Sequence, residues 1–110
     1  MNEILEEALL YDFYGELLTE HQKSIYEQYV LEDYSLSEIA AEEGISRQGV
    51  HDLVKRCQKI LTGYEEKLHL VDKFLAIRKN VHQIEELLQG YEGKNADEIL
   101  SITQKILEEL

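Results

Sequence analysis

A long seam of apolar residues constrains the fold of this chain more than any other feature of its sequence. From Val50 to Leu75 the apolar residues alternate steps of four and three positions through four heptads, and the 110 residues contain no proline. This spacing is typical of a coiled-coil-like helix, because it keeps one helix face apolar. We expect helix from Arg47 to about Gln89, with Gly63 as the place for a bend, since glycine costs about 1 kcal/mol relative to alanine in a helix. The seam comprises Val50, Val54, Cys57, Leu61, Tyr64, Leu68, Val71 and Leu75.

A helix of this length cannot bury its whole apolar stripe inside a 110-residue monomer. Either the terminal helices fold along it or a second chain does. We favour a homodimer that pairs through the stripe between residues 50 and 88, so that the stretch 60–89 forms a dimerising stalk.

The remaining sequence also predicts helices, because no run alternates apolar and polar residues in the manner of a strand. Thr19 with Gln22 and Ser35 with Glu38 have the spacing of capping boxes, which satisfy the first backbone N–H groups of a helix. Asn95 with Glu98 gives a third capping signal. The fold class is therefore all-α, as a single helical domain over residues 1–110, with further helices expected over 3–18, 20–32, 36–43 and 96–109.

Residues 35–59 have the spacing of a helix-turn-helix motif. Ser35 caps a short helix, Gly44 supplies a left-handed residue at its end, Ile45 fills the core, and Ser46 caps a second helix. In such a motif the first turns of the second helix enter the major groove, while flanking cations meet phosphates. The outward-facing residues of that helix that suit base edges or phosphates are Arg47, Gln48, His51, Lys55, Arg56 and Lys59.

Charge argues against part of this interpretation. The chain has a formal net charge of −12, which on average repels nucleic acids and anionic membranes. The charge is unevenly distributed, because residues 46–82 are net positive and both flanks are strongly negative. Asp52, on the outward face, also opposes phosphate. Three alternatives remain open: a DNA-binding protein, a module that binds a basic protein or an RNA, and a structural dimer without a ligand.

The stretch from Leu17 to Leu61 resembles the DNA-binding region 4 of sigma-70 factors. Its segments LLTEHQ, YSLSEIA and SRQGVHDLVKR are closer still to YlxM-type proteins of Gram-positive bacteria. The resemblance implies a sigma region 4-like fold with a long extended recognition helix and a C-terminal helix. It also implies a helix-turn-helix regulatory protein associated with the signal recognition particle pathway, whose partners would be duplex DNA or the protein or RNA of that particle. By motif match, Ser46 joins the recognition-helix positions.

The sequence contains no motif for catalysis, a metal or a cofactor. Phosphate-binding glycine loops, zinc motifs and nucleophile elbows are missing, and the four histidines are dispersed. We therefore expect neither enzyme activity nor a cofactor. The lone Cys57 cannot form an internal disulfide and is expected to fill the core. Apolar runs of at most four residues exclude membrane insertion, so a cytoplasmic protein is expected.

Overall fold

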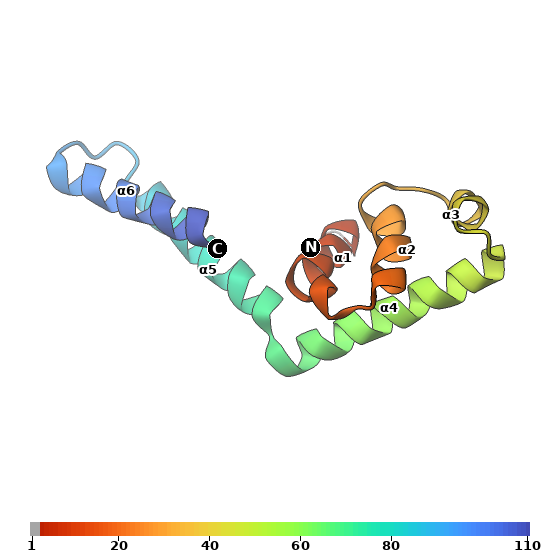
Figure 1. Ribbon diagram of the computed structural model, residues 1–110. Helices are drawn as coiled ribbons and strands as arrows, with labels where there is room; N and C mark the ends of the chain where they lie inside the picture. Colours follow the sequence, from red (N-terminus) through yellow and green to blue (C-terminus); the bar gives the residue numbers. More distant parts are fainter. Residues whose placement is uncertain (1–2) are drawn as a thin grey trace. The chain divides into compact units, whose positions relative to one another are not determined.

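The computed structural model describes residues 3–110, with side chains from Leu5 onward (Figure 1). Every regular element in this range is helical, which confirms the predicted all-α fold. In chain order the elements are α1 (Glu3–Tyr14), the 3₁₀ turn η1 (Gly15–Leu17), α2 (Glu20–Val30), α3 (Leu36–Glu43), α4 (Arg47–Leu68), α5 (Leu70–Leu87) and α6 (Lys94–Glu109).

The sequence predicted one helical domain, whereas the structure divides into two compact units. The first unit ends at Val71 and contains α1 to α4 together with the first residues of α5. The second unit spans Asp72–Leu110 and contains the rest of α5 and all of α6. The boundary falls within the stretch for which the seam predicted uninterrupted helix.

The core of the first unit is built around α4, which contacts α1, α2 and α3. Val50, Val54, Cys57 and Leu61 of α4 are at most 3% exposed. They are buried by residues of the other helices, because three helices pack against one face of α4. This part of the seam is therefore the core of the unit itself, and the prediction that a second chain covers it is wrong. The remaining buried apolar residues of the unit are Tyr14, Leu18, Ile25, Tyr26, Ile39 and Val71.

The helix starts inside the first unit follow the predicted capping residues. The Thr19 hydroxyl accepts a hydrogen bond from the Gln22 amide, and the Gln22 side chain accepts one from the Thr19 amide. Ser35 and Glu38 make the same reciprocal pair at the start of α3. Gly44 ends α3 with φ of 69°, in the left-handed region that favours glycine. These local signals therefore place the helices correctly.

Several predicted helix bounds are wrong. The first helix ends at Tyr14 and continues as η1, and the second ends at Val30 rather than Glu32. The last helix begins at Lys94 after Gly93, so Asn95 is not its cap. For the first two helices the sequence pattern extends beyond the backbone hydrogen bonds that define the helix, whereas the last helix begins before its predicted start. Ile45, expected in the core, is 36% exposed.

The long helix predicted over 47–89 is broken at His69, whose φ of 56° is left-handed. Gly63 lies inside α4, so it does not mark the break. The Tyr14 hydroxyl donates to Glu65 Oε1 at 2.6 Å and accepts from the Leu70 amide at 3.2 Å. Glu65 Oε1 also accepts from the Val71 amide at 2.9 Å. Because a new helix starts with unpaired N–H groups, these acceptors stabilise the start of α5.

The second unit is a hairpin of α5 and α6 with little interior. Its buried residues are Val81, Ala96 and Thr103, and the Thr103 hydroxyl donates to the Leu100 carbonyl at 2.8 Å. Eight of its large apolar side chains are 37–75% exposed. They are Ile77, Ile84, Leu87, Tyr91, Ile99, Leu100, Ile102 and Leu110.

Candidate nucleic-acid interface

The first half of α4 carries the residues that the sequence predicted to contact nucleic acid. The helix is held from behind by its buried residues Val50 and Val54, and the candidates lie on its accessible sides. His51 is half-buried and the other candidates are exposed, so the structure brings all of them together on one element of the first unit. They are Ser46, Arg47, Gln48, His51, Lys55, Arg56 and Lys59.

Ser46 has a structural task at this surface. Its hydroxyl accepts a hydrogen bond from the Gly49 amide at 2.9 Å and so caps the start of α4. Such a cap contributes about 1 kcal/mol to helix stability. The Ser46 side chain thus fixes the first turn of α4, on which Arg47 and Gln48 are carried.

Asp52 engages two of the candidate side chains. Gln48 Nε2 donates to Asp52 Oδ1 at 2.9 Å, and His51 Nδ1 lies 3.5 Å from the same oxygen. The carboxylate therefore orients the Gln48 amide across the exposed face and places a negative charge among the cations. A ligand that hydrogen-bonds Gln48 must compete with Asp52.

A cleft of about 390 Å³ separates the start of α2 from α4. Arg56 lines the α4 side, and His21 lines the α2 side next to the cap residue Thr19. A helix N-terminus carries a partial positive charge, and this charge together with Arg56 favours an anion, whereas Asp52 on the α4 wall of the same cleft opposes one. His21 was not among the sequence-predicted candidates; its position inside the capping box, between Thr19 and Gln22, was the available signal.

A second groove, of about 430 Å³, extends this cationic surface along α4. It contains Arg56, Lys59 and Lys67, with Tyr64 and Gly63 between them. Sequence reasoning assigned Lys67 no role at the interface. The three cations are spaced over about three turns of one helix, so this surface presents a row of cations to a phosphate backbone that follows α4.

An acidic cleft lies between α2 and α3, with a volume of about 470 Å³. Its cation, Lys23, lies 2.9 Å from Glu16 Oε2 and 3.7 Å from Glu20 Oε1. Gln28 is 8% exposed, and its amide nitrogen donates to Glu43 at 2.7 Å. Its Oε1 is buried and accepts no hydrogen bond from any described residue. The carboxylates that line the cleft belong to Glu20, Glu27, Glu32, Glu42 and Glu43.

The buried ionisable side chains of the first unit do not form a nucleophilic centre. Cys57 is fully buried, and burial raises the pKa of its thiol to about 11, which keeps it neutral at physiological pH. Burial and a hydrogen bond to Glu27 also raise the pKa of Tyr11. Tyr14 stacks on Tyr64 with ring centroids 5.9 Å apart. These residues are packing residues, as the sequence predicted for Cys57.

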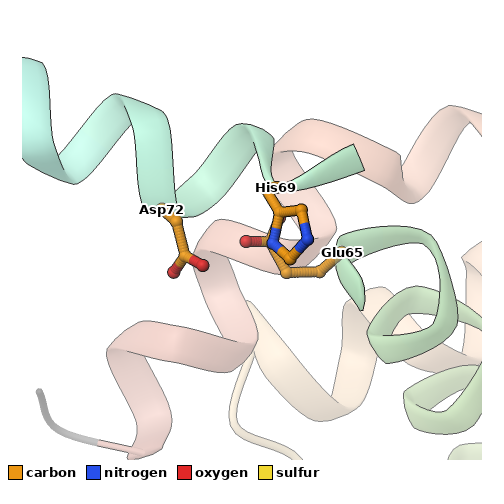
Figure 2. Close-up of side chains that lie close together, drawn as sticks. All are labelled: Glu65, His69 and Asp72. Carbon is orange, nitrogen blue, oxygen red and sulfur yellow. The ribbon is translucent and has the colours of Figure 1, made fainter. Parts of the chain in front are cut away.

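The break between α4 and α5 brings two carboxylates near an imidazole. Figure 2 shows Glu65 in the last turns of α4, His69 at its end and Asp72 in the first turn of α5. Glu65 accepts the two hydrogen bonds described above, from Tyr14 and Val71. Since Asp72 belongs to the second unit and exposed acidic groups are common on protein surfaces, we assign no metal to these residues.

No helix in the described range has the length and apolar character needed to cross a membrane.

Comparison with known proteins identifies the family. Residues 1–104 match the family described as "UPF0122: Putative helix-turn-helix protein, YlxM / p13 like". A UPF0122 protein of Desulforamulus reducens is 46% identical over 110 residues, which cover 100% of this chain and 94% of the relative. A UPF0122 protein of Lactiplantibacillus plantarum is 48% identical over 85 residues, covering 76% and 74% of the two chains. The helix-turn-helix geometry and the extent of these matches agree, and the chain belongs to the UPF0122 family of YlxM-like helix-turn-helix proteins.

Proposed function

We propose that this protein is a DNA-binding regulatory protein of the cytoplasm that uses α4 as its recognition helix. The observation that carries the proposal is the position of its cations: they project from a helix whose opposite face is the core of the unit. A helix anchored in this way can enter a major groove without rearrangement of its own unit.

In this proposal the first turns of α4 read bases and the later turns hold phosphates. Arg47 has the fork geometry for a guanine edge, and Gln48 has the donor and acceptor for an adenine edge. Lys55, Arg56 and Lys59 neutralise phosphates, and the cleft beside His21 accepts a backbone phosphate at the start of α2.

Salt-dependent binding to duplex DNA tests the proposal. Wild type should bind more weakly as salt rises, because phosphate contacts release counterions. Lys55→Ala should weaken binding to all sequences alike and lower the salt slope by about one, whereas Arg47→Ala should relax sequence preference. Lys105→Ala, an exposed lysine of α6, is the matched control and should change neither quantity. Flat, negligible binding at low salt would exclude DNA as the ligand.

Asp52 offers a test with the opposite sign. Asp52→Asn removes a negative charge from the α4 face while leaving an oxygen that can accept from Gln48. We expect this variant to bind DNA more tightly than wild type, since each nearby carboxylate opposes phosphate. Weaker binding would mean that Asp52 positions Gln48 for a base contact and that its charge is secondary.

The acidic cleft between α2 and α3 favours a second candidate function. Its five carboxylates would accept the N–H groups of a basic protein, for which electrostatic attraction speeds association. The family resemblance points to the signal recognition particle as the source of such a partner. We therefore propose, as the alternative, an accessory module that binds the protein or RNA of that particle.

Pull-down with the separate protein and RNA of the particle distinguishes the alternatives. If the acidic cleft binds the protein, Glu32→Gln combined with Glu42→Gln should reduce its retention, while Glu108→Gln on α6 should not. If the α4 surface binds the RNA, Lys55→Ala should reduce RNA retention instead. Retention of neither component would remove the alternative.

A further inference from the structure

We infer that the second unit pairs with the second unit of another copy of this chain, through an apolar face formed jointly by α5 and α6. The proposal does not depend on what α4 binds, because none of its residues belongs to the candidate nucleic-acid interface. The sequence predicted a dimer that pairs through a seam beginning at residue 50, but residues 50–61 of that seam are core of the first unit. The pairing surface inferred here is a different one.

The second unit buries too little apolar surface to be complete by itself. Over 39 residues its buried side chains are Val81, Ala96 and Thr103, one of which is polar. Chains below roughly 40 residues generally need a disulfide, a metal or association with another chain to be stable. The unit contains no cysteine, because Cys57 belongs to the first unit. Its exposed apolar residues are the surface through which association with another chain would stabilise it.

The two helices of the unit run antiparallel. Phe74, Arg78 and His82 from the first half of α5 line one pocket together with Leu107 and Leu110 from the end of α6. The start of α5 therefore lies beside the end of α6, and the loop that joins them is at the opposite end of the hairpin (Figure 1).

Most of the exposed apolar residues of both helices lie on the same side of this hairpin, and Leu100 lies on the other side of the buried line of α6. Each residue of an α-helix is rotated by about 100° around the helix axis from the one before it. Around the axis of α5, Ile77 and Ile84 therefore lie roughly 40–60° to one side of the buried Val81. Around the axis of α6, Ile99 and Ile106 lie roughly 50–70° from the buried line of Ala96 and Thr103, in the same rotational sense. When two antiparallel helices face each other, residues that are rotated in the same sense from the two contact lines lie on the same side of the helix pair. The resulting apolar face consists of Ile77, Ile84 and Leu87 from α5 and Ile99, Ile102 and Ile106 from α6.

Charge selects a second copy in antiparallel orientation as the occupant. The half of the hairpin near the loop carries five acidic residues and Lys94, whereas the half near the start of α5 carries four basic residues and three acidic ones. Two copies related by a twofold axis across the hairpin place each negative half against the half of the partner that has more basic than acidic residues. A parallel pairing would place both negative halves together. The antiparallel pair forms a four-helix bundle with a continuous apolar interior.

The molar mass in solution tests the pairing. Wild type should sediment as a dimer, at twice the chain mass of 12.9 kDa, at micromolar concentration. Ile84→Glu and Ile102→Glu, made separately, should each weaken dimerisation at least tenfold, because each buries a charge in the interface. Leu17→Glu, at a comparably exposed position of the first unit, should leave the dimer intact. Two variants are used so that a folding defect in one, detected by loss of helical circular dichroism, does not decide the result.

A monomeric wild type at 100 μM would overturn the proposal, as would a dimer that both variants leave unchanged. The orientation has its own test. Glu92→Cys places a thiol at the loop end of the hairpin. In an antiparallel pair the two thiols are at opposite ends, so oxidation should produce no disulfide-linked dimer; efficient linkage would overturn the antiparallel arrangement. Because DNA or particle binding is measured independently, failure here would leave the proposed function standing.

Discussion

The two units of this protein use similar amphipathic helices to different ends. In the first unit α1, α2 and α3 cover one face of α4, so that residues such as Ile39 and Leu61 have no exposed surface. In the second unit α5 and α6 cover each other on a single narrow line, and isoleucines such as Ile102 remain 55% exposed. An apolar stripe therefore indicates that one face of a helix packs against something. The number of neighbouring helices in the same chain decides whether the chain itself buries that face.

The largest expected contrast between the units is in their cores. Ile39→Ala, in the first unit, should lower the free energy of unfolding by about 2–5 kcal/mol, because the side chain is fully buried. Ile102→Ala, at concentrations low enough for the chain to be monomeric, should change it by less than about 0.5 kcal/mol. Denaturant unfolding measures both. Equal losses would show that the second unit has a core of its own.

Tyr14 tests what fixes the break between α4 and α5. Tyr14→Phe removes the hydroxyl that bonds Glu65 and the Leu70 amide, and we expect a loss of about 1–3 kcal/mol in unfolding free energy. Tyr34→Phe, at a 42% exposed position, is the control and should be nearly neutral. Faster amide exchange at Leu70 in the Tyr14 variant would locate the effect. Wild-type stability would contradict a role for this network.

Helix caps provide a smaller contrast between the units. Ser46→Ala should cost about 1 kcal/mol, because the hydroxyl caps α4. Asn95→Ala should cost less than about 0.5 kcal/mol, because α6 begins at Lys94 and receives no cap from a side chain at Gly93. Thermal unfolding of both variants checks this. A larger loss for Asn95 would mean that the capping signal in the sequence is used after all.

The smallest effect is on the dependence of stability on pH. Burial raises the pKa of the Cys57 thiol from 9.0 to about 11, so between pH 9 and 11 the unfolded chain loses this proton while the folded chain keeps it. Cys57 therefore contributes stability below pH 9 that is lost as pH rises to 11. Cys57→Ala should show a shallower decline over that range than wild type. Alkylation of Cys57 by iodoacetamide at pH 8 should require denaturant.

Local sequence signals predicted the first unit well. The capping boxes at Thr19 and Ser35, the left-handed Gly44 and the Ser46 cap are satisfied by residues at most four positions away, so the sequence alone displays both partners. The candidate residues on α4 could be selected for the same reason, since helical spacing determines which side chains point away from Val50 and Val54. Their binding to nucleic acid stays a prediction.

The break at His69 could not be predicted in this way. The seam continues through Leu68, Val71 and Leu75 without interruption, and histidine is an ordinary helix residue. The acceptors that stabilise the start of α5 come from Tyr14, which lies 51 residues from Glu65 and 56 from Leu70 in the chain. The position of Arg56 beside His21 likewise depends on the packing of α2 on α4.

The sequence by itself determined where the capped helices of the first unit begin, the helix-turn-helix and the cations on its exposed face, because each depends on residues within a few turns of one another. Only the tertiary structure decided where the seam is divided and which part of it is already covered. A heptad pattern records that a face is apolar, and the identity of its neighbour depends on contacts between distant segments. The first unit covers Val50 to Leu61 with its own helices, whereas the apolar face of α5 and α6 stays exposed in the second unit.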